Sequence, residues 1–297
     1  FQTPQLAFLC VIFVFIVTGN ISVIIAIFMS KARKSRMHFF ILHLAAADLL
    51  TGMITVVTDL SWKITVEWHA GLFGCKVIRF LQSVVVFAAN YILVALSIDR
   101  LDAIARPMNF SSSGRRAKML VSTAWILAFL FSAPMGIIPE LTVRRGLVQC
   151  FISLPEPWHW KVYITILAFA LFILPAIIIS TCYIIIVIVI WSKGNVSTTS
   201  NKRQLSKRGR ESTTSSRGMI PKARIKTIKM TFAIVTVFII CWVPFFVFDL
   251  ADVYGLIPRT KHKRAIAIFI QSLATLNSAT NPVIYFIFSK TQCSPLR

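Results

Sequence analysis

Long apolar stretches alternate with short polar segments along almost the whole chain. A helix needs about 20 predominantly apolar residues to cross a hydrocarbon core of ~30 Å. Each apolar stretch of this chain meets that length, and we expect each to form a spanning helix. They lie at about 4–30, 38–64, 75–107, 116–138, 160–192, 222–253 and 264–288. The pattern predicts an all-α membrane protein, a seven-transmembrane helix bundle.

Positive charge is concentrated on one side of this predicted bundle. The chain has 32 Lys and Arg against 10 Asp and Glu, and 22 of the basic residues lie in or beside the first, third and fifth linkers or the tail. Cytoplasmic loops carry the excess of Lys and Arg, so we expect the N-terminus outside and the C-terminus in the cytoplasm. With 57% hydrophobic residues, the charge indicates anionic membrane lipids as the partner and not nucleic acid.

The longest linker, about 193–221, is rich in Ser, Thr, Lys and Arg and has almost no apolar residues. We expect this basic cytoplasmic loop to be disordered, because such a segment cannot bury enough apolar surface to offset its conformational entropy. The whole chain, 1–297, is expected to be a single transmembrane domain. Both ends lie beside apolar stretches, so we expect natural tails to have been left out.

Polar side chains inside the apolar stretches are the first candidates for function. An ionised group at the bilayer centre costs about 2.5–3.5 kcal/mol, so Asp48 needs a partner or a water-filled cavity. In the last stretch Asn277, Asn281 and Tyr285 share one helix face. We expect a polar cluster that water or a cation could occupy, although Asp48 could instead only hydrogen-bond neighbouring helices. The expected cluster contains Asn20, Asp48, Asn277 and Asn281.

The residues at the two ends of the third apolar stretch indicate which end lies outside. It begins at Cys75 and reaches Asp99 and Arg100 after 24 further residues, about 36 Å of helix. Cys75 is therefore outside and the Asp-Arg pair inside. Cys150 is the only other cysteine in an outer linker, so an oxidising exterior predicts a Cys75–Cys150 disulfide. Around Gly146, the segment TVRRGLVQC predicts a hairpin.

These landmarks together resemble the rhodopsin-like family of G-protein-coupled receptors over essentially the whole chain. The matching residues are Gly19-Asn20, LAAAD ending at Asp48, Cys75 with Cys150, Asp99-Arg100, Trp125, Pro175 with Tyr183, CWVPF at 241–245 and NPVIY at 281–285. The segments VVTDLSWKI (56–64), CKVIRFLQ (75–82) and SIDRLDAIARPMNF (97–110) look like the vasopressin/oxytocin-related branch. Within that branch the likeness is greatest to receptors for neuropeptide S and crustacean cardioactive peptide, and we favour the second.

The resemblance implies a multi-pass receptor of the plasma membrane with a short peptide as its extracellular agonist. The cardioactive peptide is disulfide-cyclised and amidated, and a vasopressin-like peptide or neuropeptide S are the alternatives. The implied partners are a heterotrimeric G protein, with the calcium-mobilising class favoured, together with arrestin and receptor kinases. No catalytic residue, cofactor or metal is expected. A transporter or a channel is the alternative from another class, and cation flux without G protein would reveal a channel.

The ligand is expected to bind at the outer ends of the second, third, sixth and seventh spans. The expected lining is Asp59, Trp62, Arg79, Gln82, Phe245, Phe246, Asp249 and Gln271. Arg79 and Gln82 are three residues apart and share a helix face, where their donors suit the carbonyl groups of a peptide. Two alternatives stay open, since the two phenylalanines could be core residues and the two aspartates could be solvated charges at the rim.

The resemblance also implies a switch that opens the cytoplasmic end of the sixth span. Its expected members are Asn20, Asp48, Asp99, Arg100, Pro175, Tyr183, Phe238, Trp242, Pro244, Asn277, Asn281, Pro282 and Tyr285. The sixth span begins with basic residues only, so Asp99 is the expected partner of Arg100. Two positions depart from the family pattern. Leu101 replaces the usual Tyr, and Ala89 replaces a Ser that completes a sodium site in many members, which argues against sodium binding here.

Overall fold

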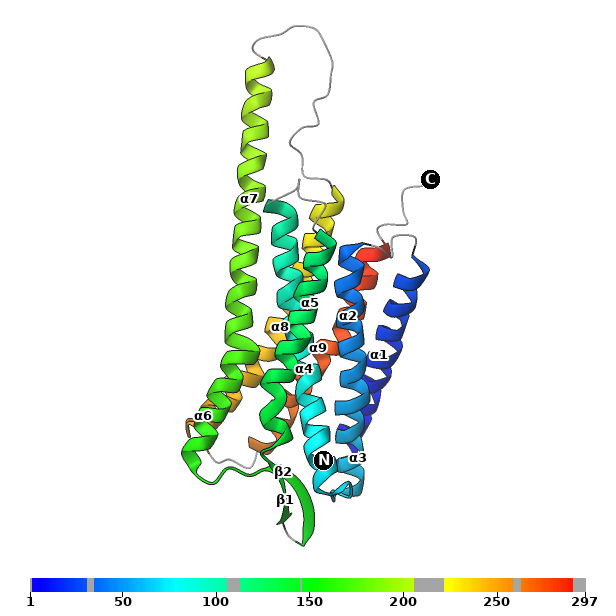
Figure 1. Cartoon of the computed structure of the whole chain (residues 1–297), viewed down its shortest axis with the longest axis vertical. Coiled ribbons are helices and arrows are strands. Elements are labelled where there is room, and N and C mark those ends of the chain that lie inside the picture. The colour runs from blue at the N-terminus through cyan, green and yellow to red at the C-terminus, as the bar shows by residue number, and fades with distance from the viewer. Residues whose placement is uncertain are drawn as a thin grey trace.

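In the computed structural model, residues 2–30, 35–105, 113–144, 146–205, 222–258 and 263–290 are described. Long helices run side by side, and a β-hairpin projects from one end of the bundle (Figure 1). The elements in chain order are α1 (Gln2–Met29), α2 (Arg36–Leu50), η1 (Thr51–Val56), α3 (Val57–Thr65), α4 (Gly71–Ala105), α5 (Ser113–Ser132), η2 (Ala133–Gly136), β1 (Pro139–Arg144), β2 (Leu147–Ile152), α6 (Pro157–Ala168), η3 (Phe169–Ile173), α7 (Leu174–Leu205), α8 (Lys222–Val253) and α9 (Lys263–Lys290).

Every predicted span coincides with one helix or one continuous run of helices. The second span is α2, η1 and α3 in succession, and the fifth is α6, η3 and α7. Among the described residues six of these spans are long and apolar enough to cross a membrane by length and composition. The seventh, α9, carries the buried polar residues Asn277, Ser278 and Asn281, which face the inside of the bundle. The seven-transmembrane bundle predicted from the sequence is thus confirmed.

One expectation about a linker is wrong in part. We expected disorder from about residue 193, but α7 continues as a helix through Leu205. The segment contains no proline, so the helix that begins in the membrane can extend into it one residue at a time without a new nucleus. The rest of that linker lies outside the described residues.

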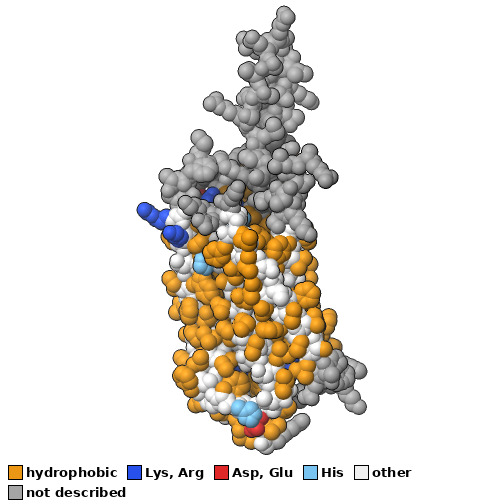
Figure 2. All heavy atoms as spheres, turned by 90° about the vertical axis from the view of Figure 1, so that its right-hand side faces the viewer, with side chains coloured by type: hydrophobic (Ala, Val, Ile, Leu, Met, Phe, Trp, Pro, Cys, Tyr) orange, Lys and Arg blue, Asp and Glu red, His pale blue; other side chains and the backbone are white. Residues whose placement is uncertain are grey.

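The two ends of the bundle differ in charge and in construction. The start of α1 lies at the end that carries β1 and β2, and the last turns of α9 lie at the opposite end (Figure 1). On the face seen in Figure 2, apolar side chains cover the middle of the bundle, with a group of Lys and Arg side chains toward one end and acidic side chains at the other. This distribution is that of a protein with an apolar belt in the membrane.

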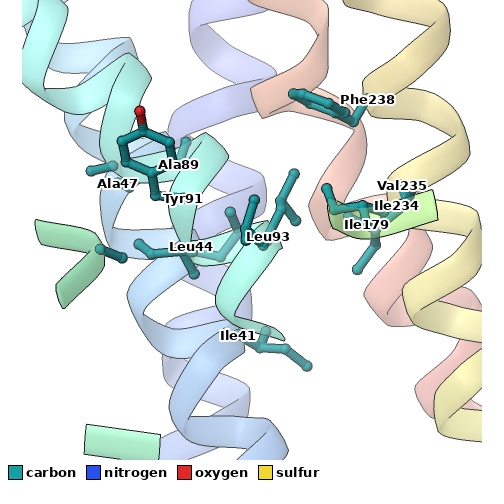
Figure 3. Packing of buried hydrophobic residues seen from close by; sticks show 14 of the residues in the cluster. Ile41, Leu44, Ala47, Ala89, Tyr91, Leu93, Ile179, Ile234, Val235 and Phe238 are labelled. Atoms are coloured by element: carbon teal, nitrogen blue, oxygen red, sulfur yellow. The ribbon is translucent and has the colours of Figure 1, made fainter. Parts of the chain in front are cut away.

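The core of the bundle is built around α4. In the most apolar stretch of α4, 78% of the helix is buried inside the bundle, whereas in the spans of α1 and α5 the buried share is 28% each. Helix α4 therefore lies at the centre, and the other two face lipid. Figure 3 shows side chains of the main buried cluster, among them Leu44 of α2, Leu93 of α4, Ile179 of α7 and Phe238 of α8. This packing fixes the positions of the polar groups described next.

Candidate functional site

The outer end of the bundle is held together by the predicted disulfide and hairpin. Cys75 at the start of α4 is bonded to Cys150 of β2, with their Cα atoms 5.7 Å apart. β1 and β2 pair antiparallel up to Arg144 and Leu147, and Gly146 turns the chain with φ of +78°. The indole of Trp68 is buried against this disulfide. The disulfide prediction is confirmed, and the hairpin forms where the turn residues predict it.

Arg79 contacts strand β2 of the hairpin and is held by three different groups. Its Nη1 donates to Oε1 of Gln82 at 3.3 Å, and its Nη2 donates to the backbone carbonyl of Cys150 at 3.3 Å. The guanidinium also lies over the ring of Trp62, 4.9 Å from the centroid. The charge of Arg79 is therefore fixed in place by uncharged groups and a ring face.

Asp59 and Gln149 lie beside these groups. We call the set of five side chains the outer polar cluster: Asp59, Trp62, Arg79, Gln82 and Gln149. The indole Nε1 of Trp62 donates to Oε1 of Gln149 at 2.8 Å, so the hairpin is bonded to α3 as well as to α4. Asp59 attracts Arg79 electrostatically from the same helix as Trp62. The cluster thus joins four of the eight predicted ligand residues with Gln149, which the sequence did not single out.

The other four predicted ligand residues do not join this cluster. Phe245 and Phe246 pack with Trp242, each with its ring centroid 5.6 Å from the indole, and Phe246 is 3% exposed. Asp249 is partly buried, and Gln271 is exposed. The alternative that Phe246 is a core residue agrees with its burial.

A cavity of about 360 Å³ lies beside the outer polar cluster and not inside it. It opens between α4, α5 and α6, and Phe87, Phe131, Met135 and Tyr163 are among its lining residues. None of the eight predicted ligand residues lines it. The expected site between the second, third, sixth and seventh spans is therefore not where this cavity forms.

Hydrogen bonds connect buried polar residues of the first, second and seventh spans, and Asn277, the fourth expected member, is buried on the same helix as Asn281. The amide of Asn281 donates to the carboxylate of Asp48 at 2.7 Å, and that of Asn20 donates to the backbone carbonyl of Ser278 at 3.1 Å. Asp48 is fully buried. Gly19 permits the approach, because a Cβ there would lie 3.0 Å from the ring of Pro282. The cluster ties α1, α2 and α9 together at mid-membrane.

The cytoplasmic end of α4 carries a network of ion pairs. Asp99, which is 2% exposed, accepts from Arg100 through one oxygen and from Arg36 at 3.1 Å through the other. Nη1 of Arg116, on α5, donates to both carboxylate oxygens of Asp102 at 3.0–3.1 Å. Asp99 is the partner of Arg100, as the sequence indicated, whereas the contact of Arg36 with Asp99 was not predicted because charge counts treat all loop arginines alike.

An aromatic chain connects the outer half of the bundle to its centre. Phe238 is completely buried, with its ring centroid 6.3 Å from Trp242 and 6.2 Å from Phe172 of η3. Pro244 lies two residues beyond Trp242 on α8, about half a turn away, and Pro175 follows η3. Nearer the cytoplasmic end, Tyr183 and Tyr285 are both 7% exposed and buried inside the bundle. The predicted switch residues thus lie along the interior of one continuous bundle.

Two side chains of α4 bond the backbone of the fifth span, an arrangement that was not predicted from the sequence and that we call the clamp on the π-helix. η3 is a π-helix, whose wider turn leaves backbone carbonyls without their usual α-helical donors. The amide of Asn90 and the hydroxyl of Tyr91, both on α4, donate to the carbonyls of Leu171 and Ala170 at 3.2 Å. Asn90 is 1% exposed. A buried Asn in the middle of an apolar span is the signal that could have found this clamp.

This arrangement of helices, disulfide and polar landmarks is that of a rhodopsin-family receptor. The family model described as "7 transmembrane receptor (rhodopsin family)" matches residues 19–285, and the chain belongs to that family. It is a multi-pass membrane protein.

The similar proteins are receptors too. The chain is 42% identical to the neuropeptide S receptor of Mus musculus over 300 residues, which cover 100% of the chain and 80% of that receptor. It is 37% identical to the mesotocin receptor of Rhinella marina over 289 residues, or 96% and 74% of the two chains. The isotocin receptor of Catostomus commersonii is 35% identical over 277 residues, or 91% and 70%. The vasopressin/oxytocin-related branch is confirmed, and the preference for the cardioactive peptide stays a prediction.

Proposed function

We propose that the chain is a plasma-membrane receptor for a short peptide, which binds at the hairpin end of the bundle and causes the opposite end to activate a heterotrimeric G protein. The observation that carries this proposal is the placement of Arg79. Its guanidinium is held between Gln82, the carbonyl of Cys150 and the ring of Trp62. A cation fixed in this way loses little conformational freedom when a ligand arrives.

The chemistry of the outer polar cluster favours a peptide. A guanidinium, an amide and a carboxylate lie together there, and a peptide offers carbonyl groups, amide groups and charged or capped termini to match them. The disulfide attaches the hairpin to α4, and the hydrogen bond between Trp62 and Gln149 attaches it to α3. The names of the similar receptors refer to neuropeptide S, mesotocin and isotocin, which supports a peptide agonist.

Among peptide agonists we favour one like the cardioactive peptide, with neuropeptide S and vasopressin-like peptides as alternatives. Binding beside Arg79 would change the packing of the aromatic chain formed by Phe246, Trp242 and Phe238. Repacking of these rings against η3 would favour the state in which the cytoplasmic end of α8 moves outward. Arg100, Tyr183 and Tyr285 would then contact the G protein. We further propose the calcium-mobilising class of G protein, with arrestin and receptor kinases as regulators, and no catalytic step.

A calcium response screen tests this function. Cells expressing the chain would receive a cardioactive peptide, neuropeptide S and a vasopressin-like peptide, each in a dose series. We expect one peptide to give a saturable calcium response that is absent from untransfected cells. The Arg79→Ala variant is the specificity control, because it should weaken that response. A cation current without any added peptide or G protein would contradict the receptor proposal and favour a channel.

A further inference from the structure

One buried carboxylate at the cytoplasmic end is shared between two arginines from different helices. Asp99 on α4 accepts from its neighbour Arg100 through Oδ2 and from Arg36, the first residue of α2, through Oδ1 at 3.1 Å. The sulfur of Met37, next to Arg36, is 4.0 Å from Nη1 of Arg100. The beginning of α2 therefore contacts both members of the Asp99–Arg100 pair.

Releasing Arg100 from this pair has a physical consequence for Asp99. The carboxylate is 2% exposed, so without another cation it would remain buried and unpaired, which is strongly unfavourable. Arg36 already occupies the other oxygen. Because it is 27% exposed at the rim, its long side chain can follow a small displacement of α4. Two guanidinium groups on one carboxylate also repel each other, which weakens the hold of Asp99 on Arg100.

We propose that Arg36 is a positioning residue that keeps Asp99 paired while Arg100 is released, and that it thereby eases the passage to the signalling state. This inference rests on the proposed function, since it is the G protein that Arg100 would meet. The same contacts could also have the opposite effect, which is to stabilise the closed state. If Arg36 mainly strengthened the closed network, its removal would increase signalling instead of reducing it.

The neighbouring ion pair provides a matched control. Arg116 on α5 lies at the same end of the bundle and bonds Asp102 at 3.0 Å. Its side chain is 33% exposed, close to the 27% of Arg36. Replacing Arg116 by Gln removes one positive charge from the same surface without touching Asp99. Any effect of net charge alone on G-protein encounter would appear equally in both variants.

The test compares Arg36→Gln, Arg36→Lys and Arg116→Gln in the full chain, reconstituted in lipid nanodiscs. Basal nucleotide exchange by a purified heterotrimeric G protein of the calcium-mobilising class is measured without agonist. We expect Arg36→Gln to lower the basal rate about fivefold, which corresponds to ~1 kcal/mol in the opening equilibrium. Arg36→Lys keeps the charge and should retain most of the rate, and Arg116→Gln should leave it unchanged.

A second measurement needs no G protein and separates this inference from the proposed function. A fluorophore on Lys229→Cys, at the exposed cytoplasmic end of α8, reports opening of that end once Cys10 and Cys293 are replaced by Ser. Arg36→Gln should shift the label population toward the closed signal. An unchanged or more open population would overturn the role of Arg36. Absence of any exchange by the unaltered chain, with the label shift intact, would count against the proposed function alone.

Discussion

Two arginines of α4, Arg79 near its outer end and Arg100 near its inner end, are held in opposite ways. The groups that accept the hydrogen bonds of Arg79 within the described chain are uncharged, namely Gln82 and the carbonyl of Cys150. Arg100 instead bonds the buried carboxylate of Asp99. A cation whose hydrogen bonds go to neutral groups stays available to a charged ligand, whereas one bonded directly to a carboxylate must first leave it. The outer arginine suits binding, and the inner one suits a switch.

The surroundings of the two arginines differ in the same sense. The outer end is cross-linked, because the disulfide and the hairpin fix β2 against α3 and α4. At the inner end α2, α4 and α5 meet through ion pairs of side chains. Ion pairs can exchange partners without breaking a covalent bond, and a disulfide cannot. We therefore expect the outer end to keep its shape during signalling while the inner end rearranges.

The largest effect should come from removing the cross-link at the outer end. Closing a loop with a sequence separation of 75 residues is worth roughly 4.5 kcal/mol in the chain-entropy model. Cys150→Ser should therefore strongly reduce both surface expression and peptide binding. Surface labelling and equilibrium binding measure the two quantities, and Cys10→Ser, at an exposed free cysteine, is the control. Normal expression together with normal binding of the Cys150 variant would show that the hairpin needs no anchor.

Neutralising the outer arginine should have the next largest effect. Arg79→Ala removes the central cation of the outer polar cluster, and Gln82→Ala removes one of its acceptors. We expect each to weaken agonist potency at least tenfold, about 1.4 kcal/mol, at unchanged surface expression. Arg144→Ala is the matched control, because Arg144 stacks on Phe151 of the hairpin outside the cluster. Wild-type potency for both cluster variants would place the peptide on the loops.

The polar cluster at mid-membrane should affect signalling more than binding. Asp48→Asn keeps an oxygen that can accept from Asn281 but removes the buried charge. We expect the maximal calcium response to fall severalfold while agonist affinity changes less than about threefold, since the cluster couples α2 to α9. Affinity is measured by peptide binding and response by calcium release in the same cells. A variant with an unchanged maximal response would disconnect this cluster from signalling.

The smallest effect is expected at the clamp on the π-helix. Asn90→Leu removes the donor to the carbonyl of Leu171 but fills a similar volume. The unsatisfied carbonyl should cost about 1 kcal/mol of stability, seen as a lower thermal midpoint of the purified receptor. Ser22→Ala is a control, because its hydroxyl only bonds back to Thr18 on the exposed face of α1. An unchanged midpoint for Asn90→Leu would indicate that η3 does not need this bond.

Hydrophobic pattern alone predicted the bundle, because the thickness of the bilayer dictates how long an apolar helix must be. The predicted span 222–253 coincides with α8, and the other predicted spans differ from the observed helices mainly at their ends. The π-helical segments η1 and η3 could not be predicted, since a shift from i−4 to i−5 bonding leaves no mark in hydropathy. The helical extension of α7 to Leu205 was missed for a related reason, as composition reports solubility and not helix propagation.

Within the site, motifs with fixed spacing were easier to predict than contacts between helices. Asp48 and Asn281 meet because each lies at a defined depth in its own span. The partner of Arg36 depends on how α2 is rotated against α4, which a charge count does not contain. Likewise, Phe246 turns inward to stack on Phe172 and Trp242, and only the packing shows this.

In the proposed receptor Arg79 serves peptide binding and Arg100 serves signalling. This division of roles is tested most directly by measuring peptide binding and G-protein nucleotide exchange for two variants, Arg79→Ala and Arg100→Ala. Arg79→Ala should lose at least tenfold in affinity and signal normally once the peptide is saturating. Arg100→Ala should bind the peptide with affinity close to that of the unaltered receptor in the absence of G protein and show little or no stimulated exchange. Equal losses of binding in both variants, or stimulated exchange that persists without Arg100, would contradict this division.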